Sequence, residues 1–355
     1  MSQVDVDGNY QELVIAVLYP RRPGPDLLPA SVRGRPVTVR HGSYIDSPAA
    51  RNAKAAGVAD AAVRDIEART TAQTRDALAA AEVVLALDLP LDVLALAPRL
   101  RWVQGYGAGV GQLIRVLGGS GVRLSTAAGI SSGAIAEFVI ARVLQVAKRL
   151  RELDERQRGH DWSPLRGQSV RGQTMLLIGL GHIGTEVARL AGAFGIRVIA
   201  VRRRTWLPAP DAVQSAVGPD QLRAVLPGAD VVVVCAAETR ETARDGPIIG
   251  AGEVNAMRPG AVLVNVARGS LVDQAAVAEA LRAGRLSAAV LDVTVPEPLP
   301  PDDELWDLPG SYISPHSSTS GDGYDERLLR LFADNLTRYA DGRPLVNPVD
   351  AELGY

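Results

Sequence analysis

Several features that mark particular protein classes are scarce in this chain of 355 residues. It contains a single cysteine, Cys235, so no disulfide can form within the chain, and the apolar sequence around this residue indicates a buried, inert thiol. Its four histidines show none of the spacings of metal ligands, and we expect no structural metal. The formal net charge is −2, which predicts attraction neither to nucleic acid nor to an anionic membrane.

Membrane and export signals are also missing from the sequence. No apolar run approaches the roughly 18 residues that a membrane-spanning helix needs. The opening residues, MSQVDVDGNYQE, are polar and acidic and do not resemble a secretory signal. We therefore expect a cytoplasmic protein. Lysine is rare as well, because 36 of the 38 basic residues are arginine, so a single surface arginine carries little information.

What the chain does contain is a repeated alternation of strand-like and helix-like segments. This pattern is typical of parallel sheets covered by helices, and a length of 355 residues with 47% apolar residues supports two domains. A first series of apolar runs occupies the N-terminal third, with a helical pattern over 59–81. The apolar period of 131–159 predicts one long helix that connects two domains.

A second series of strands follows, and a helical segment ends the chain. Its runs of Val, Ile and Leu without polar alternation indicate strands buried on both faces. We expect these strands at 175–179, 197–201, 231–236, 261–267, 287–293 and 311–315. The helical segment 322–345 is expected to pack back on the first domain. The predicted division is 1–121 and 317–355 for one domain and 122–316 for the other.

A glycine-rich turn, GLGHIG at 179–184, lies between an expected strand and an expected helix. In such a β–α–β unit, Gly179 permits the tight turn, Gly181 lets a pyrophosphate approach the backbone, and Gly184 lets helix and strand pack closely. The N–H groups at the start of the helix then bind the phosphates. The alternative is a structural glycine turn that binds nothing.

The end of the next strand indicates which dinucleotide binds. NAD-binding folds place an acidic residue about 20 positions beyond the glycine motif, where it binds the adenosine ribose. Here Arg202 holds that place and is followed by Arg203 and Arg204. A guanidinium pairs with a 2′-phosphate, whereas a carboxylate repels it, so we favour NADP(H) over NAD(H). The alternative is that these arginines are solvated loop residues.

Three further segments at expected strand ends carry charged residues suited to catalysis. They are VNVARGSLVD, LDVTVPEPLP and SPHSSTSG, and they supply Arg268, Glu297 and His316. Together with the glycine turn, in this order and with 19 positions between Glu297 and His316, they resemble the D-isomer-specific 2-hydroxyacid dehydrogenases. The resemblance is clear over roughly residues 80 to 335. It implies an α/β fold in which a Rossmann-type nucleotide domain is inserted into a flavodoxin-like substrate domain.

The resemblance also implies roles for individual residues. His316 donates a proton to the keto oxygen during hydride transfer, Glu297 favours the charged imidazolium, and Arg268 binds the substrate carboxylate and polarises the carbonyl. The backbone of Ala108, Gly109 and Val110 resembles the loop that holds the substrate carboxylate. Residues expected to bind the cofactor are Gly179, Gly181, His182, Ile183, Gly184, Arg202, Arg203, Ala267 and Asp292. His182 touches phosphate or is merely solvated, and Tyr44, Trp102 and Tyr106 either select the substrate or belong to the core.

We accordingly predict an NADPH-dependent reductase of a small 2-keto acid, of the glyoxylate or hydroxypyruvate type, that yields the D-2-hydroxy acid. Its substrate is expected between the two domains, and a homodimer built on the 131–159 region is expected from the family. Two alternatives remain open. One is an NAD-linked dehydrogenase of the 3-phosphoglycerate type, which often has an extra regulatory domain for which this chain leaves no room. The other is a nucleotide-sensing binding protein like the family's corepressors.

Overall fold

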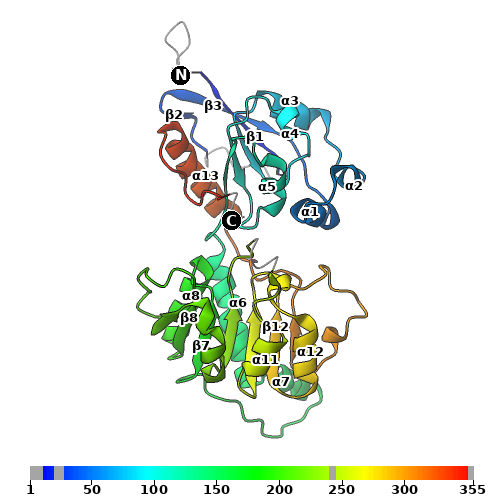
Figure 1. The fold of residues 1–355 in the computed structure, drawn as a ribbon, viewed down its shortest axis with the longest axis vertical. Helices are drawn as coiled ribbons and strands as arrows, with labels where there is room; N and C mark the ends of the chain where they lie inside the picture. Colours follow the sequence, from blue (N-terminus) through cyan, green and yellow to red (C-terminus); the bar gives the residue numbers. More distant parts are fainter. Residues whose placement is uncertain (1–10, 20–27, 240–244, 351–355) are drawn as a thin grey trace. The chain divides into compact units, whose positions relative to one another are not determined.

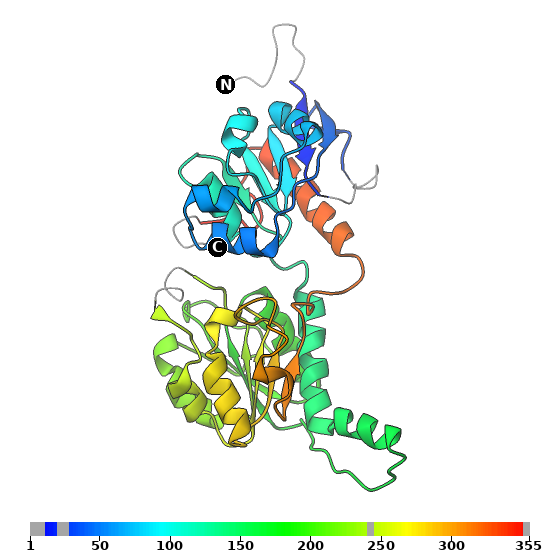
Figure 2. The same ribbon diagram turned by 90° about the vertical axis from the view of Figure 1, so that its right-hand side faces the viewer.

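The computed structural model describes residues 11–19, 28–239 and 245–350 and divides the chain into two compact units (Figure 1). Unit 1 consists of Met1–Ile130 and Asp322–Tyr355, and unit 2 consists of Ser131–Gly321. In the colours of Figure 2, unit 1 therefore combines the blue and cyan N-terminal part with the red C-terminal part. Each unit has its own sheet and its own apolar cores.

Unit 1 is built on a six-stranded sheet in the order β2-β3-β1-β4-β5-β6, in which every pair is parallel except β2 with β3. The strands are β1 (Leu13–Val17), β2 (Ser31–Val32), β3 (Arg35–His41), β4 (Val83–Ala86), β5 (Trp102–Gly105) and β6 (Arg123–Ser125). The helices are α1 (Pro48–Ala55), α2 (Asp60–Arg64), α3 (Ala72–Ala80), α4 (Val93–Leu96), α5 (Gly111–Leu117) and α13 (Tyr324–Ala340).

The two faces of this sheet are covered by different helices. Ile15 and Val17 of β1 share one core with Phe332 and Leu336 of α13, whereas Ala16 belongs to a second core with residues of α3, α4 and α5. This alternation follows from the two-residue period of a strand. The C-terminal helix therefore packs on unit 1, as the sequence predicts.

Unit 2 is built on a seven-stranded, fully parallel sheet in the order β13-β12-β11-β10-β7-β8-β9. The strands are β7 (Thr174–Ile178), β8 (Arg197–Val201), β9 (Ser215–Val217), β10 (Val231–Val234), β11 (Ala261–Asn265), β12 (Leu286–Leu291) and β13 (Ser311–Ile313). The α-helices are α6 (Ser132–Lys148), α7 (Leu150–Arg158), α8 (His182–Ala193), α9 (Leu222–Val225), α11 (Ala251–Ala256) and α12 (Gln274–Arg282). Short 3₁₀ helices are η1 (Pro219–Gln221), η2 (Leu226–Gly228), η3 (Gly269–Leu271) and η4 (Glu304–Trp306).

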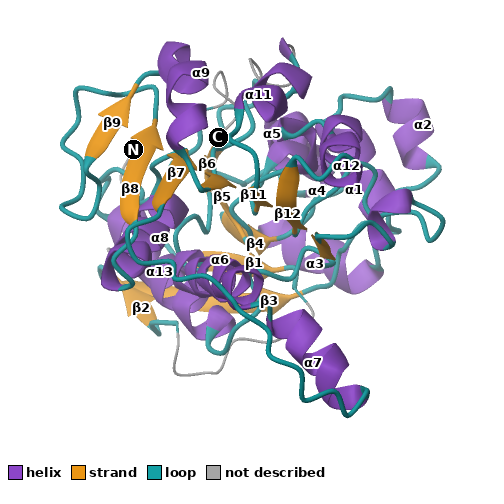
Figure 3. Cartoon of the chain, turned by 90° about the horizontal axis from the view of Figure 1, so that it is seen from below, coloured by secondary structure: helices purple, strands orange, loops and turns teal. Residues whose placement is uncertain are grey.

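Helices cover both faces of this second sheet, as the uninterrupted apolar strands require. Met175 and Leu177 of β7 pack with residues of α6 and α8, while Leu176 and Ile178 pack with residues of α11 and α12. Figures 1 and 3 show these helices flanking the strands of unit 2. The predicted doubly wound α/β architecture is confirmed.

Two helices that the sequence presents as continuous are interrupted in the structure. The expected helix 131–159 breaks at Arg149, whose left-handed conformation, with φ of 56°, ends α6 and starts α7. The expected helix 59–81 divides into α2 and α3, because the Thr71 side chain accepts the Thr74 N–H and begins a new helix there. Periodicity alone gave no sign of either break.

The unit boundaries also differ from the predicted ones. The chain leaves unit 1 after Ile130 rather than after residue 121, because β6 pairs with β5 and completes the sheet of unit 1. It returns after Gly321 rather than after residue 316, because the loop that carries His316 is hydrogen-bonded to Asp292 in unit 2. Short strands such as β6 carry too little sequence signal to be recognised in advance.

Candidate active site

The expected catalytic residues lie at the carboxyl ends of three neighbouring strands of unit 2. Arg268 follows β11, Glu297 follows β12 and His316 follows β13, and β12 pairs in parallel with both of the others. In a parallel sheet the strands all end at the same edge, so residues far apart in sequence meet there. The glycine turn after β7 reaches this edge as well, separated from β11 only by β10.

The glycine turn has the geometry that the sequence predicts. Gly179 has a φ of 105°, and an added Cβ would stand 2.7 Å from the backbone of Ala236 after β10. At Gly184 a Cβ would lie 2.4 Å from the carbonyl oxygen of Gly179. Both positions therefore require glycine for close packing. At Gly181, by contrast, a Cβ would meet nothing within 4 Å among the described residues, so this position faces open space.

Arg268 is held in a turn that Asn265 organises. The Asn265 side chain accepts the N–H of Ala267 at 3.1 Å and donates to the carbonyl of Arg268 at 2.8 Å. The half-buried guanidinium of Arg268 donates through Nη1 to the carbonyl of Ala267 at 2.7 Å. Gly269 follows, and its Cα approaches Thr294 so closely that a Cβ would meet the Thr294 oxygen at 2.3 Å. This contact brings the Arg268 turn against the loop that carries Glu297.

The side chains of Glu297 and His316 are joined by a hydrogen bond. Nδ1 of His316 lies 3.1 Å from Oε2 of Glu297, and the other carboxylate oxygen accepts the N–H of Thr294 at 3.2 Å. The two side chains are 36% and 45% exposed for Glu297 and His316, so the pair is within reach of a substrate. Among the described residues, Nε2 of His316 has no hydrogen-bond partner. The ring is thus oriented from one side and exposed on the other.

Opposing effects set the pKa of Glu297. Burial raises it, but the hydrogen bond and charge of His316, the Thr294 N–H and the charge of Arg268 outweigh burial, and the pKa of Glu297 lies below its ordinary value. The carboxylate is therefore charged throughout the neutral range. Because the shift is downward, its stabilising effect is present above the ordinary carboxylate pKa and is lost as the pH falls through the lowered one.

Asp292 is buried and anchors the loop that carries His316. Its carboxylate accepts hydrogen bonds from the Ser314 hydroxyl at 2.7 Å and from the N–H groups of Ser317 and Ser318 at 2.9 and 3.1 Å. Its backbone carbonyl accepts the N–H of His316 at 2.8 Å. The sequence suggested a place near the nicotinamide for Asp292, which stays a prediction. Its support of His316 was not foreseen, because the serines are 22 to 26 residues away.

The other residues expected at the cofactor also lie along this edge. Ala267 is buried beside Arg268, His182 is exposed at the first position of α8, and Ile183 follows it half-buried. Arg202 comes directly after β8, where its N–H donates to Val217, and its guanidinium donates to the carbonyls of Leu207 and Pro208. Arg203 is exposed at the next position.

The loop expected to hold the substrate carboxylate belongs to unit 1. Ala108 and Gly109 are exposed, and Val110 is 3% exposed in the core that includes α5. Of the three aromatic residues expected either to select the substrate or to belong to the core, Tyr44 and Trp102 are buried, which favours the core interpretation for both. Tyr106 is half-buried and donates a hydrogen bond from its hydroxyl to Asp325 at 2.5 Å.

Among the described residues, the remaining features indicate neither a reactive thiol nor a metal site. Cys235 is buried, donates to the carbonyl of Gly179 at 3.1 Å, and has a pKa raised by burial to about 12, so its thiol is inert. Within the described ranges, no cluster of histidine, cysteine and acidic side chains could hold a metal ion. No helix in the same ranges is long and apolar enough to cross a membrane.

Comparison with known proteins agrees with this geometry. Residues 140–318 match the family model described as D-isomer specific 2-hydroxyacid dehydrogenase, NAD binding domain. The chain belongs to the D-isomer specific 2-hydroxyacid dehydrogenase family. It is 32% identical to a glyoxylate reductase of Thermococcus gammatolerans over 82% of this chain and 85% of that protein. It is also 32% identical to glyoxylate/hydroxypyruvate reductase B of Pectobacterium atrosepticum over 78% of this chain and 88% of that one.

The fold is likewise that of a solved family member. A D-isomer specific 2-hydroxyacid dehydrogenase of Xanthobacter autotrophicus Py2, in complex with NADPH and MES, superposes with a TM-score of 0.75 at 25% identity. The match covers 97% of this chain and all of that one. This 2-hydroxyacid dehydrogenase is thus an oxidoreductase with a Rossmann nucleotide-binding unit, as the sequence predicts.

The residues of the glycine turn fit a dinucleotide. Gly181 leaves open space at the start of α8, and no described side chain caps that helix. Its first N–H groups and the positive end of its dipole are therefore available to a pyrophosphate. The N–H groups at the start of α8, next to Gly181, would hold the pyrophosphate, and the nicotinamide of the bound cofactor would supply or accept the hydride.

Two glycine variants separate coenzyme binding from folding. We expect Gly181→Ala to change the free energy of unfolding by no more than about 0.5 kcal/mol, since its Cβ meets nothing, but to weaken NAD(P)H binding at least about tenfold. Gly184→Ala, whose Cβ would strike the Gly179 carbonyl, should destabilise the fold by about 1–3 kcal/mol. Denaturant unfolding measures the free energy of unfolding of each variant, and coenzyme fluorescence measures its affinity for NAD(P)H. Unchanged coenzyme affinity in Gly181→Ala would contradict the assignment.

Proposed function

We propose that this enzyme reduces a small 2-keto acid of the glyoxylate or hydroxypyruvate type to the D-2-hydroxy acid, with NADPH as the reductant. The observation that carries the proposal is the pairing of His316 with Glu297 at the strand edge that also presents Arg268 and the glycine turn. The names of the relatives in Thermococcus and Pectobacterium support the same substrate class.

The proposed roles follow from charge and hydrogen-bonding capacity. Reduction adds a hydride to the carbonyl carbon and a proton to its oxygen, and the exposed Nε2 of His316 can donate that proton. Glu297 favours the imidazolium before transfer and orients the ring through Nδ1. Arg268 supplies a guanidinium for the substrate carboxylate and the developing charge on oxygen. The loop 108–110 of unit 1 stays the proposed partner for the same carboxylate.

Variants of the pair test the mechanism. We expect His316→Asn to lower kcat for glyoxylate and hydroxypyruvate by at least about a hundredfold while NADPH still binds, because the proton donor is lost. Glu297→Gln should lower kcat by a smaller factor, since the amide can still hold Nδ1 of His316 but carries no negative charge beside the proton donor. Assays that follow the loss of NADPH absorbance measure kcat for both variants.

The matched control is Glu304→Gln, which removes an exposed carboxylate from the following segment and should leave kcat unchanged. If the His316→Asn variant turned over at a near-normal rate, His316 would be excluded as the proton donor. Absence of turnover in the unaltered enzyme on any 2-keto acid would favour the nucleotide-sensing alternative instead.

We further propose that Arg202 makes NADPH the preferred coenzyme. It occupies the strand end beside the glycine turn, where Gly179 donates its N–H to Val201, and residues 202–210 after this strand include no carboxylate. Nε of Arg202 is buried without a partner among the described residues. The NADPH complex of the relative from Xanthobacter supports this coenzyme.

Arg202→Ala is expected to lower the ratio of kcat/KM for NADPH to that for NADH by about ten- to a hundredfold, the effect of losing a charged hydrogen bond to the 2′-phosphate. Arg204→Ala serves as the control for loss of an exposed arginine on the same loop and should change the ratio little. Steady-state kinetics with both coenzymes measure the ratio. If Arg202→Ala keeps the preference of the unaltered enzyme, the 2′-phosphate is bound elsewhere.

We also propose that the enzyme is a homodimer and that α7 with the loop after it contributes to the interface. None of the residues of α7 is buried, and Leu150 and Leu153 on it are 43% and 41% exposed. Trp162 on the following loop is 99% exposed, an arrangement that favours a protein partner. In Figure 2 this green helix projects from the body of unit 2. A cytoplasmic location stays a prediction from the sequence.

The oligomeric state tests this proposal directly. The unaltered protein should have twice the 37.5 kDa mass of the chain in sedimentation or light scattering, and Trp162→Glu should shift the equilibrium toward the monomer. The control is Trp206→Glu, which changes another exposed tryptophan of the same unit and should leave the mass unchanged. A monomeric unaltered protein, or no response to Trp162→Glu, would contradict the proposed interface.

A further inference from the structure

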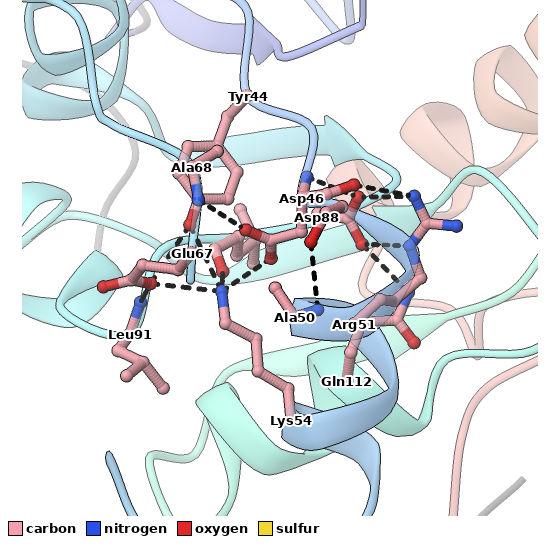
Figure 4. A network of polar contacts seen from close by, with 12 residues as sticks. Tyr44, Asp46, Ala50, Arg51, Lys54, Glu67, Ala68, Asp88, Leu91 and Gln112 are labelled. Atoms are coloured by element: carbon pink, nitrogen blue, oxygen red, sulfur yellow. Dashed lines mark hydrogen bonds and ion pairs between the residues drawn. The ribbon is translucent and has the colours of Figure 1, made fainter. Parts of the chain in front are cut away.

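A buried cluster of charges in unit 1 consists of residues with no role in the chemistry described above (Figure 4). We call it the Asp88 cluster, and its members are Asp46, Arg51, Lys54, Glu67, Asp88 and Gln112. The side chains of Lys54 and Asp46 are fully buried and 2.7 Å apart, and the Asp88 side chain is also fully buried. Burying paired charges contributes little net stability to the fold. Stability alone therefore does not explain why so many charged residues are buried together here.

Asp88 accepts four hydrogen bonds within this cluster. Arg51 donates through Nε at 3.0 Å and through Nη2 at 3.2 Å, one to each carboxylate oxygen. The N–H of Asp46 adds a bond of 3.1 Å, and the amide of Gln112 adds a longer one of 3.4 Å. All of these partners are donors, so each would lose its acceptor if the carboxylate were removed.

The position of Asp88 places it beside the loop proposed for the substrate carboxylate. β4 and β5 pair in parallel with Ala86 opposite Gly105, and the N–H of Tyr106 donates to the carbonyl of Ala86 at 2.8 Å. Asp88 stands two residues beyond this last ladder bond, at the level where the loop 107–110 begins. Asp88 and the loop therefore follow the ends of two paired strands, β4 and β5.

Gln112 connects Asp88 to the other end of the same loop. It is the second residue of α5, which begins at Gly111 directly after the loop. Its amide nitrogen donates to the carbonyl of Leu87 at 2.9 Å as well as to Asp88. The segment 87–88 is thus bonded to the start of the helix that the loop enters, and it adjoins the strand that the loop leaves.

The rest of the cluster holds the segment after Asp88 from the opposite side. Lys54 donates to the carbonyl of Leu89 at 2.9 Å, and Glu67 accepts the N–H of Leu91 at 3.3 Å. Neither Lys54 nor Glu67 is bonded to α5 among the described contacts. Among the described residues, the side chains of the cluster are therefore hydrogen-bonded to α5 through Asp88 and not through Lys54 or Glu67.

We propose that Asp88 is a positioning residue that fixes the loop 107–110 through Gln112 and the bonded segment 87–88. Backbone N–H groups bind a carboxylate well only when their directions are set in advance, and displacements near 1 Å are costly. The consequence for substrate binding rests on the proposed function of the loop. The fixing of the loop itself does not depend on it.

Hydrogen exchange and kinetics test the two parts of the inference separately. In Asp88→Asn, peptides that cover 106–113 should exchange amide hydrogens at least about tenfold faster than in the unaltered enzyme. The KM for the keto acid should rise about tenfold, with kcat within about twofold and NADPH affinity unchanged, the pattern of weakened ground-state and transition-state binding alike. Gln112→Leu should produce the same effects in a smaller degree.

Glu67→Gln is the matched control, because it removes a charge from the same cluster at a residue whose described hydrogen bonds go to Leu91 and Tyr44 and not to α5. If Glu67→Gln increases exchange in 106–113 as much as Asp88→Asn, the cluster is a general support and the assignment to Asp88 is wrong. Unchanged exchange and KM in folded Asp88→Asn would also overturn it. If Asp88→Asn does not fold, Gln112→Leu decides by the same criteria.

The two proposals fail in different ways. Lack of keto-acid turnover in the unaltered enzyme would refute the proposed function, and exchange in 106–113 would still report whether Asp88 fixes the loop. Normal turnover with unchanged exchange in the variants would refute only the positioning role.

Discussion

The arrangement of the His316 loop depends on the hydrogen bonds of the buried Asp292 carboxylate. His316 has a φ of 51°, in the left-handed region that a residue with a side chain rarely adopts and that costs on the order of 1–3 kcal/mol. Hydrogen bonds from Ser314, Ser317 and Ser318 to Asp292 hold the chain on both sides of His316 and offset this cost. With the backbone fixed in this way, the imidazole lies against Glu297 rather than turning into solvent.

Strand order then determines which groups surround that imidazole. The strands β11, β12 and β13 are neighbours in a parallel sheet. The residues that follow them, Arg268, Glu297 and His316, therefore reach the same edge although they are far apart in sequence. The close approach of Gly269 to Thr294 joins two of the three loops directly. A larger residue at 269 would separate the guanidinium from the carboxylate whose pKa it helps to lower.

The sequence predicted this part of the site because it depends on strand ends and glycine positions, which leave a local signal. The apolar runs located β7, β8 and β10 to β13, and the structure brings the residues just beyond β11, β12 and β13 to one edge of the sheet. The break at Arg149, the strand β6 and the support of His316 by Asp292 could not be predicted in this way. Each depends on backbone hydrogen bonds between segments that only the tertiary fold brings together. The Asp88 cluster was missed for the same reason, since its partners lie 8 to 42 residues apart.

The carboxylates of Asp88, Asp292 and Glu297 differ in how deeply they are buried. This difference determines whether each carboxylate can exchange protons with solvent or only hold a loop in place. Asp88 and Asp292 are 0% and 1% exposed, and hydrogen bonds from the protein occupy both oxygens of each, so they can hold loops but cannot exchange protons with a substrate. Glu297 is half-buried and shares one oxygen with an exposed imidazole. Proton transfer requires a pair that solvent and substrate can reach, whereas positioning requires groups from which water is excluded. A rigid, buried carboxylate such as Asp292 can therefore hold the loop of His316 in place while the His316–Glu297 pair stays accessible.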